Sequence, residues 1–204
     1  MNRCICPICS GDISDKIGEI KLWIPKEYHL PEGYNIVSCK TCGFCYSDTE
    51  ATLKDYEYYY ANCNMYQGMP APNDDWEWLN RKAENLISAY VSSESRMLDM
   101  GFGKGAFLKW MNARGYNNMV GIDPSGASVS AIRECGISAE VGSIFGETIE
   151  KYSNSMDCVF LFDVLEHMLY PRTAIDSLKK YVKSDGLLLI SVPNYAYLKE
   201  NDNP

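Results

Sequence analysis

One segment carries most of the information on fold class: Leu98-Asp99-Met100-Gly101-Phe102-Gly103-Lys104-Gly105-Ala106-Phe107-Leu108. The apolar run 96–100 predicts a strand, and residues 104–114 have the pattern of a helix. Glycines between strand and helix let the backbone come close to a ligand. Because Ala106 follows them, the glycines also fit the Gly-x-Gly-x-x-Gly/Ala fingerprint of dinucleotide binding. A tight strand–helix turn without a ligand is the remaining interpretation.

Strands and helices alternate from about residue 95 onward. Apolar runs predict strands at 96–100, 119–122, 138–141, 158–162 and 187–192, with helices at 104–114, 127–135, near 147 and at 171–182. Such strands indicate a parallel sheet covered on both faces, so we expect an α/β fold with a doubly wound, mostly parallel sheet. Ligands bind these sheets at the carboxyl ends of the strands. Asp123 ends the second strand, 18 residues after Gly105, where an acid can bind ribose hydroxyls.

Cysteines gather at the N-terminus, where six of the nine fall within the first 45 residues. Two Cys-x-x-Cys pairs supply four thiolates, the tetrahedral ligand set of structural zinc. Glycine follows Cys42, so we expect the ligands to be Cys6, Cys9, Cys39 and Cys42. Cys42 with Cys45 is an alternative second pair, and Cys4 is an alternative to Cys6. An iron site of the rubredoxin kind and unliganded, reduced cysteines also fit the pattern.

The sequence divides into three parts. Residues 1–48 hold the expected zinc module, with strands at 19–24 and 34–38. Residues 49–93 read as a helical linker or lid, and residues 94–204 as the α/β domain. Within the linker a helix begins after a capping signal at 49–54, and a second opens at Asp74. That second helix has an apolar face with helical spacing, made of Trp78, Leu79, Ala83, Leu86, Ile87 and Tyr90.

Composition limits the partners. The 204 residues carry a formal net charge of −8 and a pI of about 4.8. An acidic chain is a poor match for nucleic acid or an anionic membrane, which both select basic surfaces. Apolar runs stay short of the roughly 18 residues that a spanning helix needs, and the N-terminal residues lack a signal-peptide core. We therefore expect a cytoplasmic protein that binds neither nucleic acid nor membrane.

Four segments, taken in order, resemble one enzyme family. Asp99 with Gly101-x-Gly103-x-Gly105 resembles motif I of the class I S-adenosylmethionine-dependent methyltransferases. The second, fourth and fifth strands resemble later motifs of that family: Val120-Gly121-Ile122-Asp123-Pro124-Ser125, Asp157-Cys158-Val159-Phe160-Leu161-Phe162-Asp163-Val164-Leu165-Glu166-His167 and Leu189-Ile190-Ser191-Val192-Pro193-Asn194. A nicotinamide-binding domain is not expected to carry the last two.

The resemblance implies roles for individual residues. Asp99 holds the amino group of the cofactor's methionine moiety, next to the glycine turn of Gly101, Phe102, Gly103 and Gly105. Asp123 accepts both ribose hydroxyls, and Pro124 flanks the adenine. Ser143 stands where many members have an aspartate that contacts the adenine amine, so it and Ile144 are expected to line the adenine pocket in a different way.

In the resemblance, residues at the end of the fourth strand lie next to the transferred methyl group. Phe162 and Asp163 are expected to face the methyl donor and the acceptor. His167 is the one histidine in this half of the chain, and it is the candidate base for an acceptor that must lose a proton. Packing or capping of the following helix is the alternative role for His167, and a magnesium site at Asp163-x-x-Glu166-His167 is a weaker one.

The N-terminal part resembles the zinc module that precedes some of these domains, including sugar C-methyltransferases. In that resemblance Cys42-Gly43-Phe44 leads into a tyrosine-rich segment, here Tyr58-Tyr59-Tyr60. The predicted function is methyl transfer from S-adenosylmethionine to a small molecule, such as a sugar or another metabolite. The alternative is a non-catalytic domain that keeps the cofactor fold and uses the zinc module to bind a partner.

A complete class I domain has two more strands after the fifth, so we expect this chain to be truncated or its sheet to be completed by another segment. Residues 187–192 are uniformly apolar, and an exposed apolar edge is a template for strand pairing. We therefore expect self-association through this strand, or its coverage by residues 195–204 or by the N-terminal module.

Overall fold

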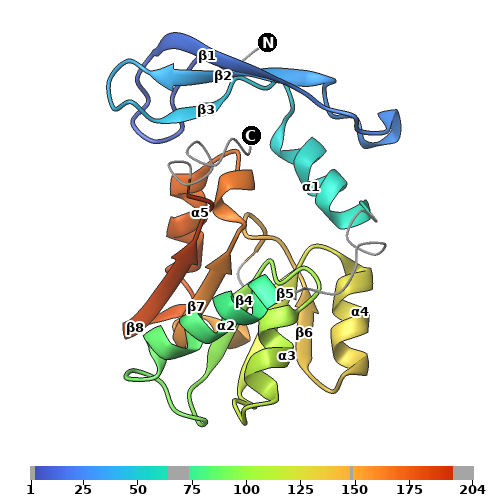
Figure 1. Cartoon of the computed structure of the whole chain (residues 1–204), viewed down its shortest axis with the longest axis vertical. Helices are drawn as coiled ribbons and strands as arrows, with labels where there is room; N and C mark the ends of the chain where they lie inside the picture. Colours follow the sequence, from blue (N-terminus) through green and yellow to red (C-terminus); the bar gives the residue numbers. More distant parts are fainter. Residues whose placement is uncertain (1–2, 64–73, 148, 195–204) are drawn as a thin grey trace. The chain divides into compact units, whose positions relative to one another are not determined.

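The computed structural model describes residues 3–63, 74–147 and 149–194, and divides the chain into two compact units (Figure 1). The described part of the first unit is residues 3–63 with Leu169–Arg172. The second unit holds the remaining described residues up to Met168 and again from Thr173. Helix α1 (Leu53–Asn62) belongs to the first unit and α2 (Asp74–Ile87) to the second.

The first unit contains a small antiparallel sheet in the order β1 (Ile13–Lys21), β2 (Gly33–Cys39), β3 (Cys45–Ser47), with a 3-10 turn η1 (Lys26–Tyr28). Its buried core consists of four residues: Cys6, Val37, Cys39 and Tyr46. So small a core leaves little hydrophobic stabilisation, and domains of this size commonly depend on a metal or disulfides. Strand β1 begins six residues earlier than predicted and ends before 22–24, and β3 was not predicted.

Helix α1 begins where the sequence indicated a cap. The Thr52 hydroxyl accepts from the Asp55 N–H, and the Asp55 carboxylate accepts from the Thr52 N–H, which completes a capping box. Two tyrosines of the helix pack against the η1 turn, with Tyr58 stacked on His29 and Tyr59 edge-on to Tyr28. In the described part of the chain these tyrosines therefore have a packing role within the first unit.

The second unit is built on a five-stranded parallel sheet in the order β6-β5-β4-β7-β8. Its strands are β4 (Met97–Met100), β5 (Met119–Asp123), β6 (Ser138–Val141), β7 (Met156–Phe162) and β8 (Val182–Ser191). The connections contain α3 (Ala106–Asn112), α4 (Gly126–Glu134), η3 (Glu150–Tyr152), η4 (Leu165–His167) and α5 (Pro171–Leu178). The predicted α/β fold with a mostly parallel sheet is confirmed.

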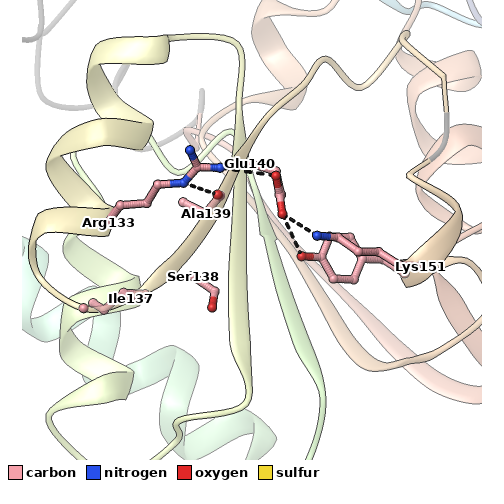
Figure 2. Close-up of a pocket in the computed structure, with 8 residues that line it drawn as sticks. Arg133, Ile137, Ser138, Ala139, Glu140 and Lys151 are labelled. Atoms are coloured by element: carbon pink, nitrogen blue, oxygen red, sulfur yellow. Dashed lines mark hydrogen bonds and ion pairs between the residues drawn. The ribbon is translucent and has the colours of Figure 1, made fainter.

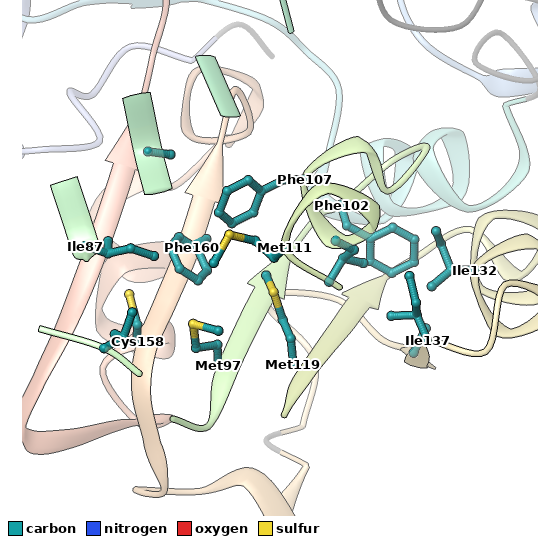
Figure 3. Close-up of a cluster of buried hydrophobic side chains, with 14 of the residues drawn as sticks. Ile87, Met97, Phe102, Phe107, Met111, Met119, Ile132, Ile137, Cys158 and Phe160 are labelled. Carbon is teal, nitrogen blue, oxygen red and sulfur yellow. The ribbon is translucent and has the colours of Figure 1, made fainter. Parts of the chain in front are cut away.

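Apolar layers cover both faces of this sheet. One cluster joins alternate strand residues to α2, α3 and α4, and Figure 3 shows Ile87, Phe107 and Phe160 meeting there. The other cluster joins Leu98, Val159 and their neighbours to α5. Consecutive residues such as Met97 and Leu98 point into opposite layers, as the pleat of a strand requires. Both faces are therefore buried, and this explains why the strands read as continuous apolar runs.

The structure differs from the prediction at the boundary between α5 and β8 and in the buried face of α2. Helix α5 ends at Leu178, and β8 already begins at Val182, where Lys183 Nζ lies 2.6 Å from Asp157 Oδ1 of β7. In α2 the buried face contains Asn80, Ala83 and Ile87, whereas three members of the predicted face are largely exposed: Trp78, Leu86 and Tyr90. One helix face is too narrow to bury the whole predicted set.

Within the described residues, the structure contains no helix with the length and apolar character needed to cross a membrane.

Candidate functional site

The strand order reverses between β4 and β7, which lie side by side at the centre of the sheet. From β4 the chain moves to β5 and β6 on one side, and it then crosses to β7 and β8 on the other. In open α/β sheets this arrangement leaves a crevice at the carboxyl ends of the two central strands. The predicted residues Asp99, Asp123, Ser143 and Phe162 all lie in or directly after the carboxyl ends of β4, β5, β6 and β7.

Three glycines of the turn after β4 adopt left-handed backbone angles, with φ of 75° at Gly101, 54° at Gly103 and 69° at Gly105. A Cβ on Gly101 would lie 2.8 Å from Val164 Cγ2, and one on Gly105 would overlap Ile132 of α4. A Cβ on Gly103 would meet nothing within 4 Å. Two glycines are therefore required by packing, whereas Gly103 opens onto free space.

Two buried carboxylates flank this turn. Asp123 is 6% exposed, and it accepts from the Gly103 N–H (N···Oδ2 2.9 Å) and the Ser125 N–H (N···Oδ1 2.8 Å). Burial raises the pKa of Asp123, and these two hydrogen bonds work against that rise. Asp123 thereby ties the glycine turn to the start of α4.

Asp99 is 3% exposed and lies in β4, two residues before the first glycine of the turn. Within the described ranges no group donates a hydrogen bond to its carboxyl. Burial raises the pKa of Asp99 to about 7, and the nearby charge of Asp123 adds to the rise. A buried carboxylate without donors costs free energy, and a cationic ligand would offset that cost. The site therefore fits a ligand that brings a positive charge to Asp99.

The remaining predicted residues lie at or shortly after the carboxyl ends of β5, β6 and β7. Pro124 is half-buried after β5, and Ile144 is buried in the second apolar cluster. The Ser143 hydroxyl accepts from the Phe145 N–H (3.2 Å), so it shapes its own turn. The Phe162 ring lies edge-on to Phe107 of α3, with 4.9 Å between ring centroids.

Asp163 at the end of β7 was among the predicted site residues, whereas its two neighbours in space, Val164 and Ser191, were not. Asp163 has a left-handed φ of 53°, and its carboxylate accepts from the Ser191 hydroxyl (3.1 Å) at the end of β8. Val164 follows and packs on Gly101. The sequence carries no local signal for these contacts, because they join residues 28 and 63 positions apart.

His167 lies in η4, and its side chain is 46% exposed. Its Nε2 is 3.9 Å from Glu166 Oε1, which is too far for a hydrogen bond. The Glu166 side chain is 26% exposed, and desolvation raises its pKa. The imidazole is thus partly open to solvent.

The expected metal ligands lie in the first unit. The sulfurs of Cys6, Cys9, Cys39 and Cys42 all lie within 4.8 Å of one another, with Cys6–Cys42 at 3.8 Å and Cys9–Cys39 at 3.4 Å. A tetrahedral zinc site with Zn–S bonds of about 2.3 Å separates its sulfurs by about 3.8 Å. The residue after each pair, Ser10 or Gly43, is left-handed.

Backbone amides point at two of these sulfurs, and the Ile8 N–H donates to Cys6 Sγ at 3.4 Å. The N–H groups of Thr41 and Cys42 donate to Cys39 Sγ at 3.3 and 3.5 Å. The bond from Cys42 is the main cause that lowers the pKa of Cys39 to about 6. Donors aimed at a thiolate are what a metal-binding turn provides. The four residues therefore fit a four-thiolate metal centre.

Comparison with known proteins identifies the family. A family model described as a methyltransferase domain matches residues 76–203, which is more than half of the chain. A ubiquinone biosynthesis O-methyltransferase of Agrobacterium fabrum is 29% identical over 103 residues. That alignment covers 48% of this chain and 41% of the relative, so the chain spans less than half of the relative's length.

Two solved structures share the fold. The PH0226 protein of Pyrococcus horikoshii aligns with a TM-score of 0.54 at 19% identity, covering 69% of this chain and 68% of that one. An amino pentose methyltransferase of Micromonospora echinaspora, solved with S-adenosylmethionine bound, aligns with a TM-score of 0.51 at 19% identity, covering 65% and 55%. The family predicted from the four motifs is confirmed, and the chain belongs to the methyltransferase-domain family, with the fold of the class I S-adenosylmethionine-dependent enzymes.

Proposed function

We propose that this chain binds S-adenosylmethionine at the carboxyl ends of β4, β5 and β7 and transfers its methyl group to a small-molecule acceptor. The observation that carries the proposal is Asp99, a buried carboxyl without a hydrogen-bond donor beside a left-handed glycine turn. The ammonium group of the cofactor's methionine moiety would supply the missing charge. The non-catalytic alternative is not favoured by the family match.

Asp123 is suited to bind the ribose. Each of its oxygens already accepts one backbone N–H, and each keeps a second lone pair for a ribose hydroxyl. Those two N–H groups hold the carboxylate at a fixed angle, so little entropy is lost when a ligand binds. Pro124, Ser143 and Ile144 would border the adenine. Gly103, which has no side chain, would let the cofactor come close to the backbone of the turn.

S-adenosylmethionine, when bound, supplies a methyl group on a sulfonium centre, which is a good leaving group. The protein's task is then mainly to align donor and acceptor. Phe162 and Asp163 at the end of β7 would line the acceptor side. For an acceptor that must lose a proton, the partly exposed His167 imidazole is the proposed base.

The charge of the chain and the names of similar proteins both bear on the class of acceptor. The chain's net charge of −8 disfavours nucleic acid as the acceptor. The names of the two relatives refer to ubiquinone biosynthesis and to an amino pentose. These names support a metabolite or a sugar as the acceptor of this chain.

The test is cofactor binding by calorimetry, with S-adenosylhomocysteine as the probe. Asp123→Ala removes acceptors for two hydroxyls, and bonds to a charged group contribute about 1.5–3 kcal/mol each. We expect at least tenfold weaker binding, since each factor of ten is about 1.4 kcal/mol. Asp123→Asn keeps the shape if the alanine variant unfolds, and Asp185→Ala on the exposed part of β8 is the matched control.

Equal affinity in wild type and Asp123→Ala would remove the assigned role of Asp123. Preferential binding of a nicotinamide dinucleotide would overturn the proposed function.

We further propose that Cys6, Cys9, Cys39 and Cys42 hold one structural zinc ion. The sulfur separations and the donors to Cys39 support this. A site with four thiolates leaves no open position, so the metal would hold the fold of residues 3–48 and take no part in catalysis. Reduced thiolates suit a cytoplasmic location, and the likeness of this unit to the module of sugar C-methyltransferases stays a prediction.

Elemental analysis of protein purified without added metal tests the zinc site. We expect one zinc ion per chain in wild type and loss of zinc in Cys39→Ser, with Cys135→Ser as the control because Cys135 is exposed on the other unit. Iron with visible colour would favour the rubredoxin-like alternative. A metal-free wild type would remove the proposal.

A further inference from the structure

The turn that follows β7 has a strained residue at its first position. Asp163 is one of four described residues other than glycine with a positive φ, and the other three are Ser10, His29 and Asn154. A left-handed conformation costs a residue with a side chain on the order of 1 kcal/mol. Such a conformation persists where neighbouring groups hold it. Something in the structure must therefore stabilise Asp163 in this state.

Ser191 contacts Asp163 through both its backbone and its side chain. Phe162 and Ser191 form the last register pair between β7 and β8. The Asp163 N–H donates to the Ser191 carbonyl at 3.2 Å, and the Ser191 hydroxyl donates to Asp163 Oδ1 at 3.1 Å. The first bond is available to any residue at position 191. The second depends on the hydroxyl, which donates to a carboxylate oxygen, and its length exceeds the range of about 2.5–2.7 Å for the strongest bonds of this kind.

The conformation of Asp163 determines where the next residue lies. Val164 packs against the glycine turn so closely that a Cβ on Gly101 would be 2.8 Å from its Cγ2. On the other side, Phe162 lies against Phe107 of α3. The turn after β7 is therefore fitted between α3 and the glycine turn, and a change at Asp163 would move the surface that faces the crevice.

We propose that Ser191 is a positioning residue for the cofactor site: its hydroxyl holds Asp163 left-handed and so keeps the turn of residues 163–167 closed on Gly101. This inference rests on the proposed function, because it assigns Ser191 to the site in which S-adenosylmethionine would bind. Ser191 itself contacts neither donor nor acceptor and acts through Asp163.

The experiment combines conservative variants with a double-mutant cycle. Ser191→Ala removes the hydroxyl, and Ser191→Thr keeps it on a residue that favours strands. Asp163→Gly removes the accepting carboxylate and also the strain, because glycine adopts positive φ readily. Binding of S-adenosylhomocysteine is measured by calorimetry for the single variants and for the double variant. Amide hydrogen exchange of residues 163–167 is measured on the same proteins without ligand.

We expect Ser191→Ala to weaken binding by about five- to tenfold and to speed exchange in the turn, since one charge-assisted hydrogen bond is lost. Ser191→Thr should stay within about twofold of wild type in both measurements. In the Asp163→Gly background, Ser191→Ala should change affinity by less than about twofold, because its partner is already absent.

Unchanged binding and exchange in Ser191→Ala would overturn the inference. The same loss of affinity with and without the Asp163 carboxylate would overturn it as well, since Ser191 would then act by another route. A wild-type chain that does not bind S-adenosylhomocysteine overturns the proposed function. The exchange rates of the free protein still decide in that case whether Ser191 holds the turn.

Discussion

Asp99 shows how burial changes the chemistry of a single residue. The residue is 3% exposed, and the pKa of its carboxyl is raised from 3.8 to about 7, mainly by loss of solvation. Between about pH 4 and pH 7 the folded state holds a proton that the unfolded state has lost. The free energy of unfolding therefore falls as pH rises through this window, so that ionised Asp99 destabilises the free protein above pH 7.

We predict that Asp99→Asn raises the stability of the ligand-free protein at pH 8. The amide has nearly the same shape and no charge, and the shift in pKa corresponds to an effect on the order of 4 kcal/mol at most. The gain should shrink toward pH 4.5. Thermal unfolding at the two pH values measures it, and binding of S-adenosylhomocysteine should be weaker in the same variant.

Asp157→Asn is the matched control, because its shift has the opposite sign. The Asp157 carboxylate pairs with Lys183, and this pair lowers its pKa. The stability that it contributes is present above the unfolded pKa of 3.8 and is lost as pH falls through the lower folded value. This variant should therefore be less stable than wild type at pH 8. A loss of stability at pH 8 in Asp99→Asn would contradict the assigned electrostatics.

At the scale of one element, the glycine turn after β4 combines two requirements. Gly105 makes room for α4, because a Cβ there would overlap Ile132, whereas Gly103 borders open space. Both are left-handed. The same substitution should therefore have different consequences at two positions that lie two residues apart.

We predict that Gly105→Ala lowers the free energy of unfolding by about 2–4 kcal/mol, from overpacking and the unfavourable φ together. Gly103→Ala should cost about 1–2 kcal/mol, from φ alone. It should nevertheless weaken S-adenosylhomocysteine at least tenfold, because its methyl group would fill the space proposed for the ligand. Urea denaturation and calorimetry measure the two effects, and equal destabilisation of both variants would contradict the packing argument.

At the scale of the whole sheet, the two edges are built differently. On the β6 edge, Arg133 Nε donates to the Ala139 carbonyl, and Glu140 lies between Arg133 and Lys151, as Figure 2 shows. Side-chain charges of this kind discourage pairing with another strand. Among the described residues β8 pairs on one side only, with β7, and its residues Leu187–Ile190 are half-buried.

We predict that this chain self-associates through β8, by pairing with the β8 strand of a second copy. Val192 is 51% exposed just beyond β8, and Val192→Lys should lower the association without disturbing the apolar layers. Val141→Lys, at the 58% exposed end of β6, is the matched control and should change nothing. Light scattering after size exclusion reports the mass.

A monomer at millimolar concentration whose 187–192 amides exchange freely would contradict this prediction. Protected amides in a monomer would instead indicate that another part of the chain covers the strand.

Local patterns in the sequence were sufficient for the fold class and for the composition of the candidate site. The glycine spacing at 101–105, the apolar strands and the paired cysteines are determined by residues close together in the chain, and their conformations depend on local sterics and periodicity. This is why β6 matches its predicted range and why Asp99 and Asp123 fall at the strand ends as expected.

Contacts between distant residues were decided by the tertiary structure alone. The helical spacing of the large side chains in α2 could not show which members face the sheet, because it places exposed Trp78 and buried Ile87 in the same set. At the early start of β8, Val182 pairs with Met156 and Lys183 meets Asp157, and in the turn after β7 Asp163 meets Ser191. The raised pKa of Asp99 likewise arises only when the sheet closes over it and brings Asp123 near. Each of these features depends on contacts between segments that are far apart in the sequence, so local patterns could not predict them.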